Sequence, residues 1–74
     1  MTRSQLPKTE KFTDKYMTLH TKKFPNGWKA IKSTGQMGTD DWTLYDENRK
    51  CVEGSIKTID QLVHEYNKWV KIYK

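Results

Sequence analysis

The apolar residues in the last part of the chain recur with the period of an α-helix. They fall at i, i+3, i+4, i+7, i+10, i+11 and i+14, namely Ile59, Leu62, Val63, Tyr66, Trp69, Val70 and Tyr73. On a helix with about 3.6 residues per turn, these positions form one stripe. Thr58 and Gln61 have the spacing of a capping box at its start. The sequence therefore predicts an amphipathic helix over residues 59–73, with Trp69 and Tyr73 buried against a sheet.

Four segments before the helix have the composition or the alternation of short β-strands. They are residues 15–23, 28–32, 42–45 and 51–56. The first two flank the sequence F-P-N-G at 24–27, which favours a tight turn because proline presets φ and Asn-Gly tolerates positive φ. The last two flank a turn at 46–50, in which we expect Asn48 to adopt the left-handed conformation. Residues 33–41 are polar, contain two glycines and are predicted to be a loop.

This order of elements predicts an α+β fold, a small antiparallel sheet of three to four strands with one C-terminal amphipathic helix packed on one face. Residues 1–14 show no hydrophobic period, so we expect a flexible basic N-terminal arm before a single α+β domain over residues 15–74. Apolar residues make up 34% of the chain, against roughly 45–50% in a typical globular protein. Nine aromatic residues offset this shortage in part, which indicates a thin, aromatic-rich core.

Cysteine usage and hydropathy indicate the cellular compartment of the protein. Cys51 is the only cysteine, so no internal disulfide can form, which is unusual for a secreted domain of this size. No apolar run approaches the roughly 18 residues of a transmembrane helix, and the charged N-terminus lacks a signal-peptide pattern. We therefore expect a cytoplasmic protein that does not contact a membrane.

The net charge of +5 is distributed unevenly along the chain. Residues 1–23 sum to +4, residues 24–56 to −1 and residues 57–74 to +2. A positive field favours polyanions such as nucleic acid, or an acidic protein surface. The alternative interpretation is solubility alone, because a net charge of about 2–8 is ordinary for a small domain.

No constellation of catalytic or metal-ligating residues stands out. Zinc sites need clustered Cys and His ligands, whereas this chain has Cys51, His20 and His64, well separated in sequence. A catalytic Cys51 would need His20 beside it, which requires their strands to be adjacent. The G-Q-M-G segment lacks the Lys-Ser/Thr that completes a phosphate-binding loop. We therefore expect a protein that is not an enzyme, with no catalytic residue, no metal and no cofactor.

The remaining candidate function is binding through the surface. Lysines lie on both sides of the 24–27 turn with an aromatic residue between them, a combination that small domains use to hold phosphates and bases. The residues predicted to contact nucleic acid or an acidic partner are Arg3, Lys22, Lys23, Trp28, Lys29 and Lys32. Lysines outnumber arginines 12 to 2, which favours backbone contact over base reading. The first hypothesis is therefore a small binding module that contacts nucleic acid through this hairpin and the N-terminal arm.

The second hypothesis is a protein-binding inhibitor or modulator from a phage or mobile element. Its docking residues would be Met37, in the 33–41 loop, and Ile72, off the helix stripe. The order W-x-L-Y, turn, strand and capped helix over residues 28–70 is similar to the arm-binding domains of phage integrases. The short, lysine-rich chain is also similar in style to host-takeover proteins of phages. These likenesses contain no diagnostic motif, so no residue role is carried over. We expect a monomer or a weak homodimer.

Overall fold

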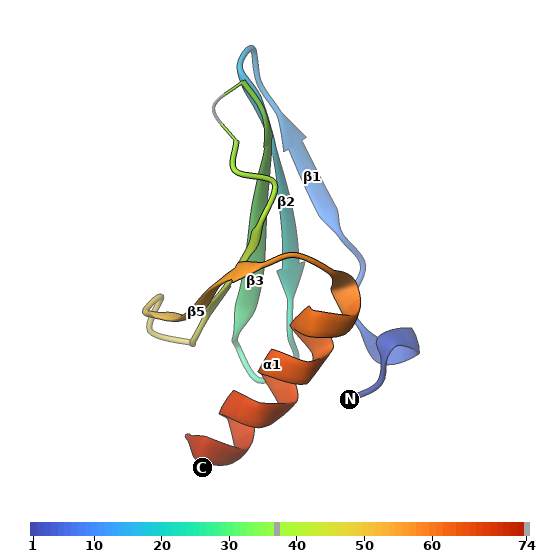
Figure 1. The fold of residues 1–74 in the computed structure, drawn as a ribbon, viewed down its shortest axis with the longest axis vertical. Helices are drawn as coiled ribbons and strands as arrows, with labels where there is room; N and C mark the ends of the chain where they lie inside the picture. Colours follow the sequence, from blue (N-terminus) through green and yellow to red (C-terminus); the bar gives the residue numbers. More distant parts are fainter. Residues whose placement is uncertain (37, 74) are drawn as a thin grey trace.

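A computed structural model describes residues 1–36 and 38–73 and contains one antiparallel sheet and one helix (Figure 1). The strands are β1 (Glu10–Thr13), β2 (Met17–Lys23), β3 (Lys29–Gly35), β4 (Trp42–Tyr45) and β5 (Cys51–Ile56). They are hydrogen-bonded in the order β1-β2-β3-β4-β5, so every strand neighbours the next one in sequence. A short 3₁₀ turn, η1 (Arg3–Gln5), precedes them and the helix α1 (Ile59–Ile72) follows. The predicted α+β class with a C-terminal helix is confirmed, but the sheet has five strands rather than three to four.

The additional strand lies in the segment predicted to be an arm. β1 pairs with β2 so that Phe12 lies opposite Leu19. All four residues of β1 are exposed, so its sequence shows no alternation of apolar and polar residues that would predict a strand. The first residues also contact the domain, because Asn67 on α1 donates a hydrogen bond of 2.8 Å to the carbonyl oxygen of Met1.

β2 and β3 form a long hairpin around the predicted turn. The amide of Phe24 donates to the carbonyl of Trp28 at 2.8 Å, and Gly27 adopts a φ of +91°. β3 continues to Gly35, three residues beyond the predicted strand, because Ser33 and Thr34 pair with Leu19 and Thr18 of β2. The predicted loop therefore begins after Gly35.

β4 and β5 are joined by a turn that Asp46 stabilises. Its carboxylate oxygen Oδ1 accepts hydrogen bonds of 2.9 Å from the amides of Asn48 and Lys50. Arg49, with a φ of +65°, takes the left-handed position that was expected for Asn48. The register of β4 and β5 shifts between Trp42 and Tyr45, and Ser55 on β5 has a φ of +56°.

The helix begins as predicted and covers the lower part of one sheet face (Figure 1). The hydroxyl of Thr58 accepts a hydrogen bond of 3.0 Å from the amide of Gln61. The Gln61 side chain accepts at 3.0 Å from the amide of Lys57, one residue before the position that a capping box predicts. α1 has 14 residues, and no helix in the described chain is long and apolar enough to cross a membrane.

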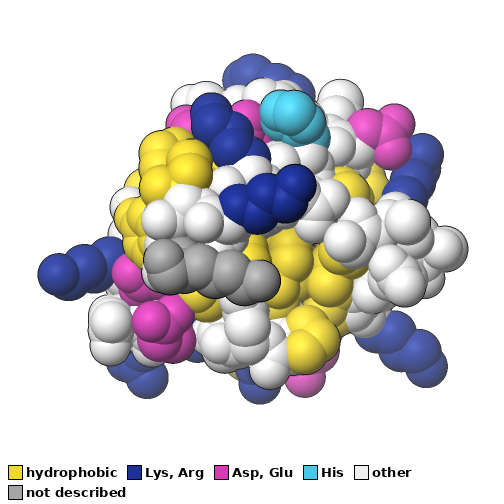
Figure 2. Space-filling view, turned by 90° about the horizontal axis from the view of Figure 1, so that it is seen from below, with side chains coloured by type: hydrophobic (Ala, Val, Ile, Leu, Met, Phe, Trp, Pro, Cys, Tyr) yellow, Lys and Arg dark blue, Asp and Glu magenta, His cyan; other side chains and the backbone are white. Residues whose placement is uncertain are grey.

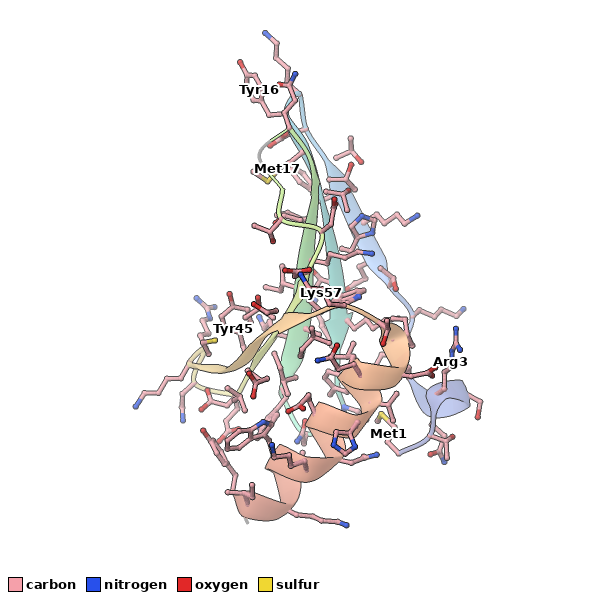
Figure 3. The ribbon with its side chains drawn as sticks, in the orientation of Figure 1. Met1, Arg3, Tyr16, Met17, Tyr45 and Lys57 are labelled. Atoms are coloured by element: carbon pink, nitrogen blue, oxygen red, sulfur yellow. The ribbon has the colours of Figure 1, made fainter. Side chains whose placement is uncertain are left out.

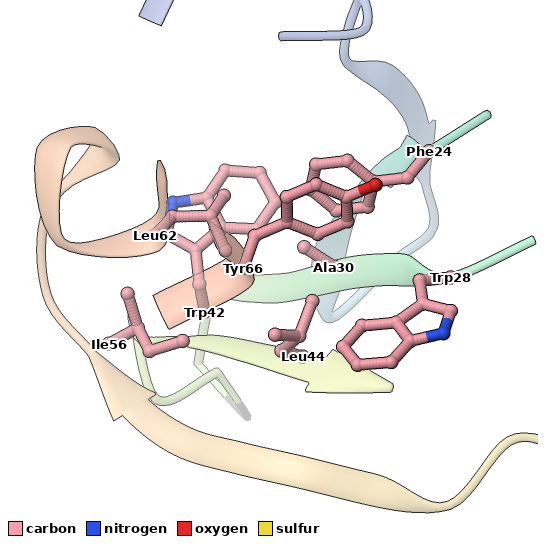
Figure 4. Packing of buried hydrophobic residues seen from close by; sticks show 8 residues of the cluster. All are labelled: Phe24, Trp28, Ala30, Trp42, Leu44, Ile56, Leu62 and Tyr66. Carbon is pink, nitrogen blue, oxygen red and sulfur yellow. The ribbon is translucent and has the colours of Figure 1, made fainter. Parts of the chain in front are cut away.

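Eight side chains form the core between α1 and the sheet (Figure 4). They are Phe24, Trp28, Ala30, Trp42, Leu44, Ile56, Leu62 and Tyr66. The rings of Phe24 and Tyr66 stack with their centroids 4.1 Å apart. The end of the predicted stripe differs from expectation, because Tyr73 packs edge-on against Trp28 yet remains 53% exposed. The core therefore sits at the lower end of the sheet, and the upper parts of β1, β2 and β3 extend beyond it.

Candidate nucleic-acid interface

Three basic side chains lie side by side on the sheet face that α1 partly covers. Lys11 of β1 lies directly opposite His20 of β2, which in turn lies opposite Lys32 of β3. Lys32 also lies opposite Trp42, a core residue beneath the helix, so all three side chains share the helix-side face. We call Lys11, His20 and Lys32 the basic row. α1 contacts β4, β5 and η1, and the basic row lies on the other three strands.

A row of hydroxyl groups lies one step further along the same strands. Thr13, Thr18 and Thr34 are opposite one another, two residues from the members of the basic row. The hydroxyl oxygens of Thr13 and Thr18 are 3.2 Å apart, and His20 Nε2 is 3.1 Å from Thr34 Oγ1. Ammonium, imidazole and hydroxyl groups all donate hydrogen bonds, so the two rows together present donors to an anionic oxygen.

Lys22 extends the positive charge toward the core. Its side chain is buried, and Nζ donates a hydrogen bond of 2.9 Å to the carbonyl oxygen of Pro7. The Nζ atoms of Lys22 and Lys32 lie 5.8 Å and 5.2 Å from the centroid of the Trp42 ring, which is within cation–π range. Burial, and then the charge of Lys32, lower the pKa of Lys22.

The basic row and Lys22 take no part in the ion pairs that the structure describes. In the described chain, none of the basic-row residues nor Lys22 has a carboxylate within salt-bridge distance; the ion pairs are Arg3–Asp60, Lys23–Glu10 and Lys57–Asp41. Burial lowers the pKa of His20, and the neighbouring charges of Lys32 and Lys11 lower it further. Lys11 and Lys32 lie on either side of His20, so their charges disfavour the protonated imidazole. A bound anion would relieve this effect.

The lysines predicted around the hairpin turn are divided between the two faces of the sheet. Lys22 and Lys32 lie on the helix side, as described above. Lys23 and Lys29 lie opposite each other on the other side, and Lys23 pairs with Glu10 at 3.4 Å. The side-chain period of two in a strand separates neighbouring lysines in this way. A single ligand surface cannot contain all four.

The other predicted site residues are separate from the basic row. Trp28 is 4% exposed and lies in the core, so its ring does not offer a stacking surface. Arg3 is exposed in η1, with its guanidinium 3.5 Å from Asp60 in the first turn of α1. Ile72 is exposed near the end of α1, and Met37 lies outside the described residues.

Lys11 and His20, two members of the basic row, were not among the predicted binding residues. Lys11 lies in β1, which gives no strand signal, and the position of His20 beside Lys32 depends on the β2–β3 register.

The structure does not bring Cys51 and His20 together. They lie on β5 and β2, which two strands separate, a lateral distance of about 14 Å at the usual strand spacing. They also face opposite sides, since Cys51 shares a face with Tyr45 and Lys29. Within residues 1–36 and 38–73, no three His, Cys, Asp or Glu side chains are arranged to hold a metal ion.

The chain was also compared with known proteins. No protein-family profile, no curated protein sequence and no solved structure matches it.

Proposed function

We propose that the protein is a small non-enzymatic binding module that contacts the phosphate backbone of nucleic acid. The contact surface is the helix-side face formed by the basic row, and the buried Lys22 adds its positive charge beneath that surface. The observation that supports this proposal is the alignment of Lys11, His20 and Lys32 on three adjacent strands without a carboxylate beside them. Phosphate groups would neutralise the lysine charges and favour the protonated form of His20.

The dimensions and chemistry of the row suit phosphates better than bases. Three adjacent strands span about 10 Å, a width over which the row can contact neighbouring phosphates of one nucleic-acid strand. Neither arginine of the chain, Arg3 or Arg49, belongs to the row, so the bidentate group that usually reads guanine is absent from it. We expect binding with little sequence preference.

The test is a salt series with a short duplex and a single strand of the same sequence. We expect the wild-type protein to bind both nucleic acids at about 50 mM salt. The logarithm of its affinity should fall linearly with the logarithm of the salt concentration. Lys32→Gln weakens binding and reduces the slope by about one. Lys50→Gln is the matched control, because Lys50 lies exposed in the β4–β5 turn, away from the row. Absence of binding at low salt, or equal loss in both variants, would contradict the proposal.

A second candidate function, docking on another protein, has its own support at the end of α1. Ile72 and Tyr73 are 58% and 53% exposed, and shallow hollows lie on both sides of Val70. Figure 2, which views the molecule from this end, shows hydrophobic side chains exposed between charged ones. Apolar groups exposed together in this way are typical of protein–protein contacts.

Two variants distinguish the candidate functions. If a protein is the partner, one stoichiometric protein is recovered in a pull-down after nuclease treatment. Ile72→Asp then removes it and Lys32→Gln does not. If nucleic acid is the partner, Lys32→Gln weakens its binding and Ile72→Asp does not. Recovery that nuclease abolishes would exclude the docking function.

A further inference from the structure

A second site candidate lies on the sheet face opposite the basic row. A hollow of about 240 Å³ is lined by Lys29, Ile31, Tyr45 and Arg49. Lys29 and Tyr45 are directly opposite each other on β3 and β4, and Ile31 is two residues from Lys29 on the same face. Figure 3 shows Tyr45 on the side of the molecule where β4 and β5 meet, far from Arg3 and Met1. The hollow therefore lies on the face opposite the basic row, and its lining residues come from β3, β4 and the β4–β5 turn.

The lining combines an apolar surface with two positive charges. Ile31 and Tyr45 provide aliphatic and aromatic surface, and both are half-buried. Lys29 and Arg49 provide the charges, and neither has a carboxylate within 4 Å in the part of the chain that the structure describes. Among the described residues, no Asp or Glu lines the hollow. It is smaller than the roughly 300–1,000 Å³ of a site for a drug-sized ligand and it is open to solvent, so a ligand of nucleotide size would be only partly enclosed.

The backbone at Arg49, like that at Asp40 and Ser55, has a conformation that favours glycine. Its φ of +65° is in the left-handed region, which costs a residue with a Cβ about 1–2 kcal/mol and a glycine almost nothing. The turn itself is fixed by the Asp46 carboxylate, which accepts from the amides of Asn48 and Lys50 and holds the residue between them. A glycine at position 49 would relax this turn, but it would remove the guanidinium from the hollow.

We propose that this hollow binds one nucleotide unit, with its base against Tyr45 and Ile31 and its phosphate on Arg49 and Lys29. Aromatic side chains stack on any base, because every base has a π-face. The guanidinium matches two phosphate oxygens bidentately, and the lysine adds a second charge for the dianion. This site does not depend on the basic row, so it stands or fails independently of the proposed backbone contact.

The experiment is a titration of adenosine 5′-monophosphate followed by amide chemical shifts. Saturable shifts are expected at the residues of the hollow. Adenosine alone and inorganic phosphate alone should each bind at least about tenfold more weakly, since each lacks one of the two interactions. Inorganic phosphate binding as tightly as the nucleotide would overturn the base contact. The absence of saturable shifts at about 10 mM nucleotide would overturn the site.

Arg49→Gly is the decisive variant, because a defect in folding cannot explain its expected result. It loses about tenfold to a hundredfold in nucleotide affinity, the effect of removing a hydrogen bond to a charged group. At the same time its melting temperature rises by about 4–8 °C, since the left-handed turn is relieved. Unchanged nucleotide affinity in this variant would overturn the proposal.

Lys32→Gln separates this site from the proposed function. It weakens duplex binding and leaves the nucleotide titration unchanged, whereas Arg49→Gly does the reverse. Failure of the nucleotide titration alone would leave the basic row as a backbone site. Failure of duplex binding alone would leave the hollow as a nucleotide site.

Discussion

The indole Nε1 of Trp28 donates a hydrogen bond of 2.7 Å to Oε2 of Glu47. This bond joins the two turns at the lower end of the sheet, since Trp28 follows the β2–β3 turn and Glu47 lies in the β4–β5 turn. It also explains how a large ring with a polar atom is accommodated in the core, where an unpaired donor would be costly.

Glu47→Ala is expected to lower the free energy of unfolding by about 1–2 kcal/mol, because the buried indole N–H loses its acceptor. Glu47→Gln keeps an acceptor oxygen and should cost less than half as much. Thermal unfolding measures both, with a decrease of about 4–8 °C in melting temperature for each kcal/mol. Lys50→Ala in the same turn is the control, since its side chain is exposed. If Glu47→Ala were as stable as the wild type, a water molecule would be accepting the hydrogen bond of the indole in place of Glu47.

Gly35 and Gly54 form a matched pair for testing the backbone. Gly35 has a φ of +108°, and a Cβ there would lie 2.8 Å from the carbonyl oxygen of Tyr16. Gly54 has no positive φ, and a Cβ there would meet no atom within 4 Å. Gly35→Ala should destabilise by about 1–3 kcal/mol through strain and contact with backbone. Gly54→Ala should be neutral or stabilise by up to about 1 kcal/mol, because alanine reduces the conformational entropy of the unfolded chain. Denaturant unfolding measures the stability of the two variants. Similar losses of stability in both would contradict this interpretation.

The elements that were predicted correctly are those with strong local signals. The helix was recognisable because seven apolar residues repeat at its period and Thr58 precedes them. The β4 and β5 bounds follow from short apolar alternation next to a turn. β1 was missed because all its residues are exposed, so only pairing with β2 stabilises it as a strand. The basic row could not be predicted, because it depends on the register of three strands rather than on any local pattern.

The same distinction explains the division of the predicted lysines. Their number and their position beside the turn are properties of the sequence, and both were recognised. Whether neighbouring lysines share a face depends on which of them points toward the core, and the core position of Ala30 decides this for the β2–β3 hairpin. Lys22 lies opposite Ala30, so it is on the helix side, and Lys23 is on the other.

The start of α1 gives a prediction about local stability. Thr58→Ala removes the oxygen that accepts from the amide of Gln61, at an expected cost of about 1 kcal/mol. Thr58→Ser keeps this oxygen and should retain most of the stability. Thr39→Ala, at an exposed position outside the helix and strands, is the control. Chemical denaturation with a circular-dichroism readout distinguishes them, and an alanine variant as stable as wild type would show that the cap contributes nothing.

His20 gives a pH dependence to both stability and binding. Its pKa in the folded protein is lowered from the usual value of about 6.5, first by burial and then by Lys32 and Lys11. Above that value the imidazole is neutral whether the chain is folded or unfolded. As the pH falls below it, the unfolded chain takes up a proton first, so the free energy of unfolding decreases. The decrease ends once the pH has passed through the folded-state pKa. A bound phosphate favours the charged imidazole, so duplex binding should tighten as the pH falls toward the pKa of His20 in the free folded protein.

An imidazole titration by NMR tests this pH dependence directly. A His64→Gln background leaves His20 as the only histidine of the chain, so its ring signals need no assignment. The free protein should titrate below pH 6.5, and adding Lys32→Gln should move the pKa upward, because one of the two neighbouring charges is removed. Adding duplex should also raise it, since phosphates stabilise the charged ring. If duplex does not change the pKa of His20, then His20 lies outside the binding surface, even if the protein binds nucleic acid through its lysines.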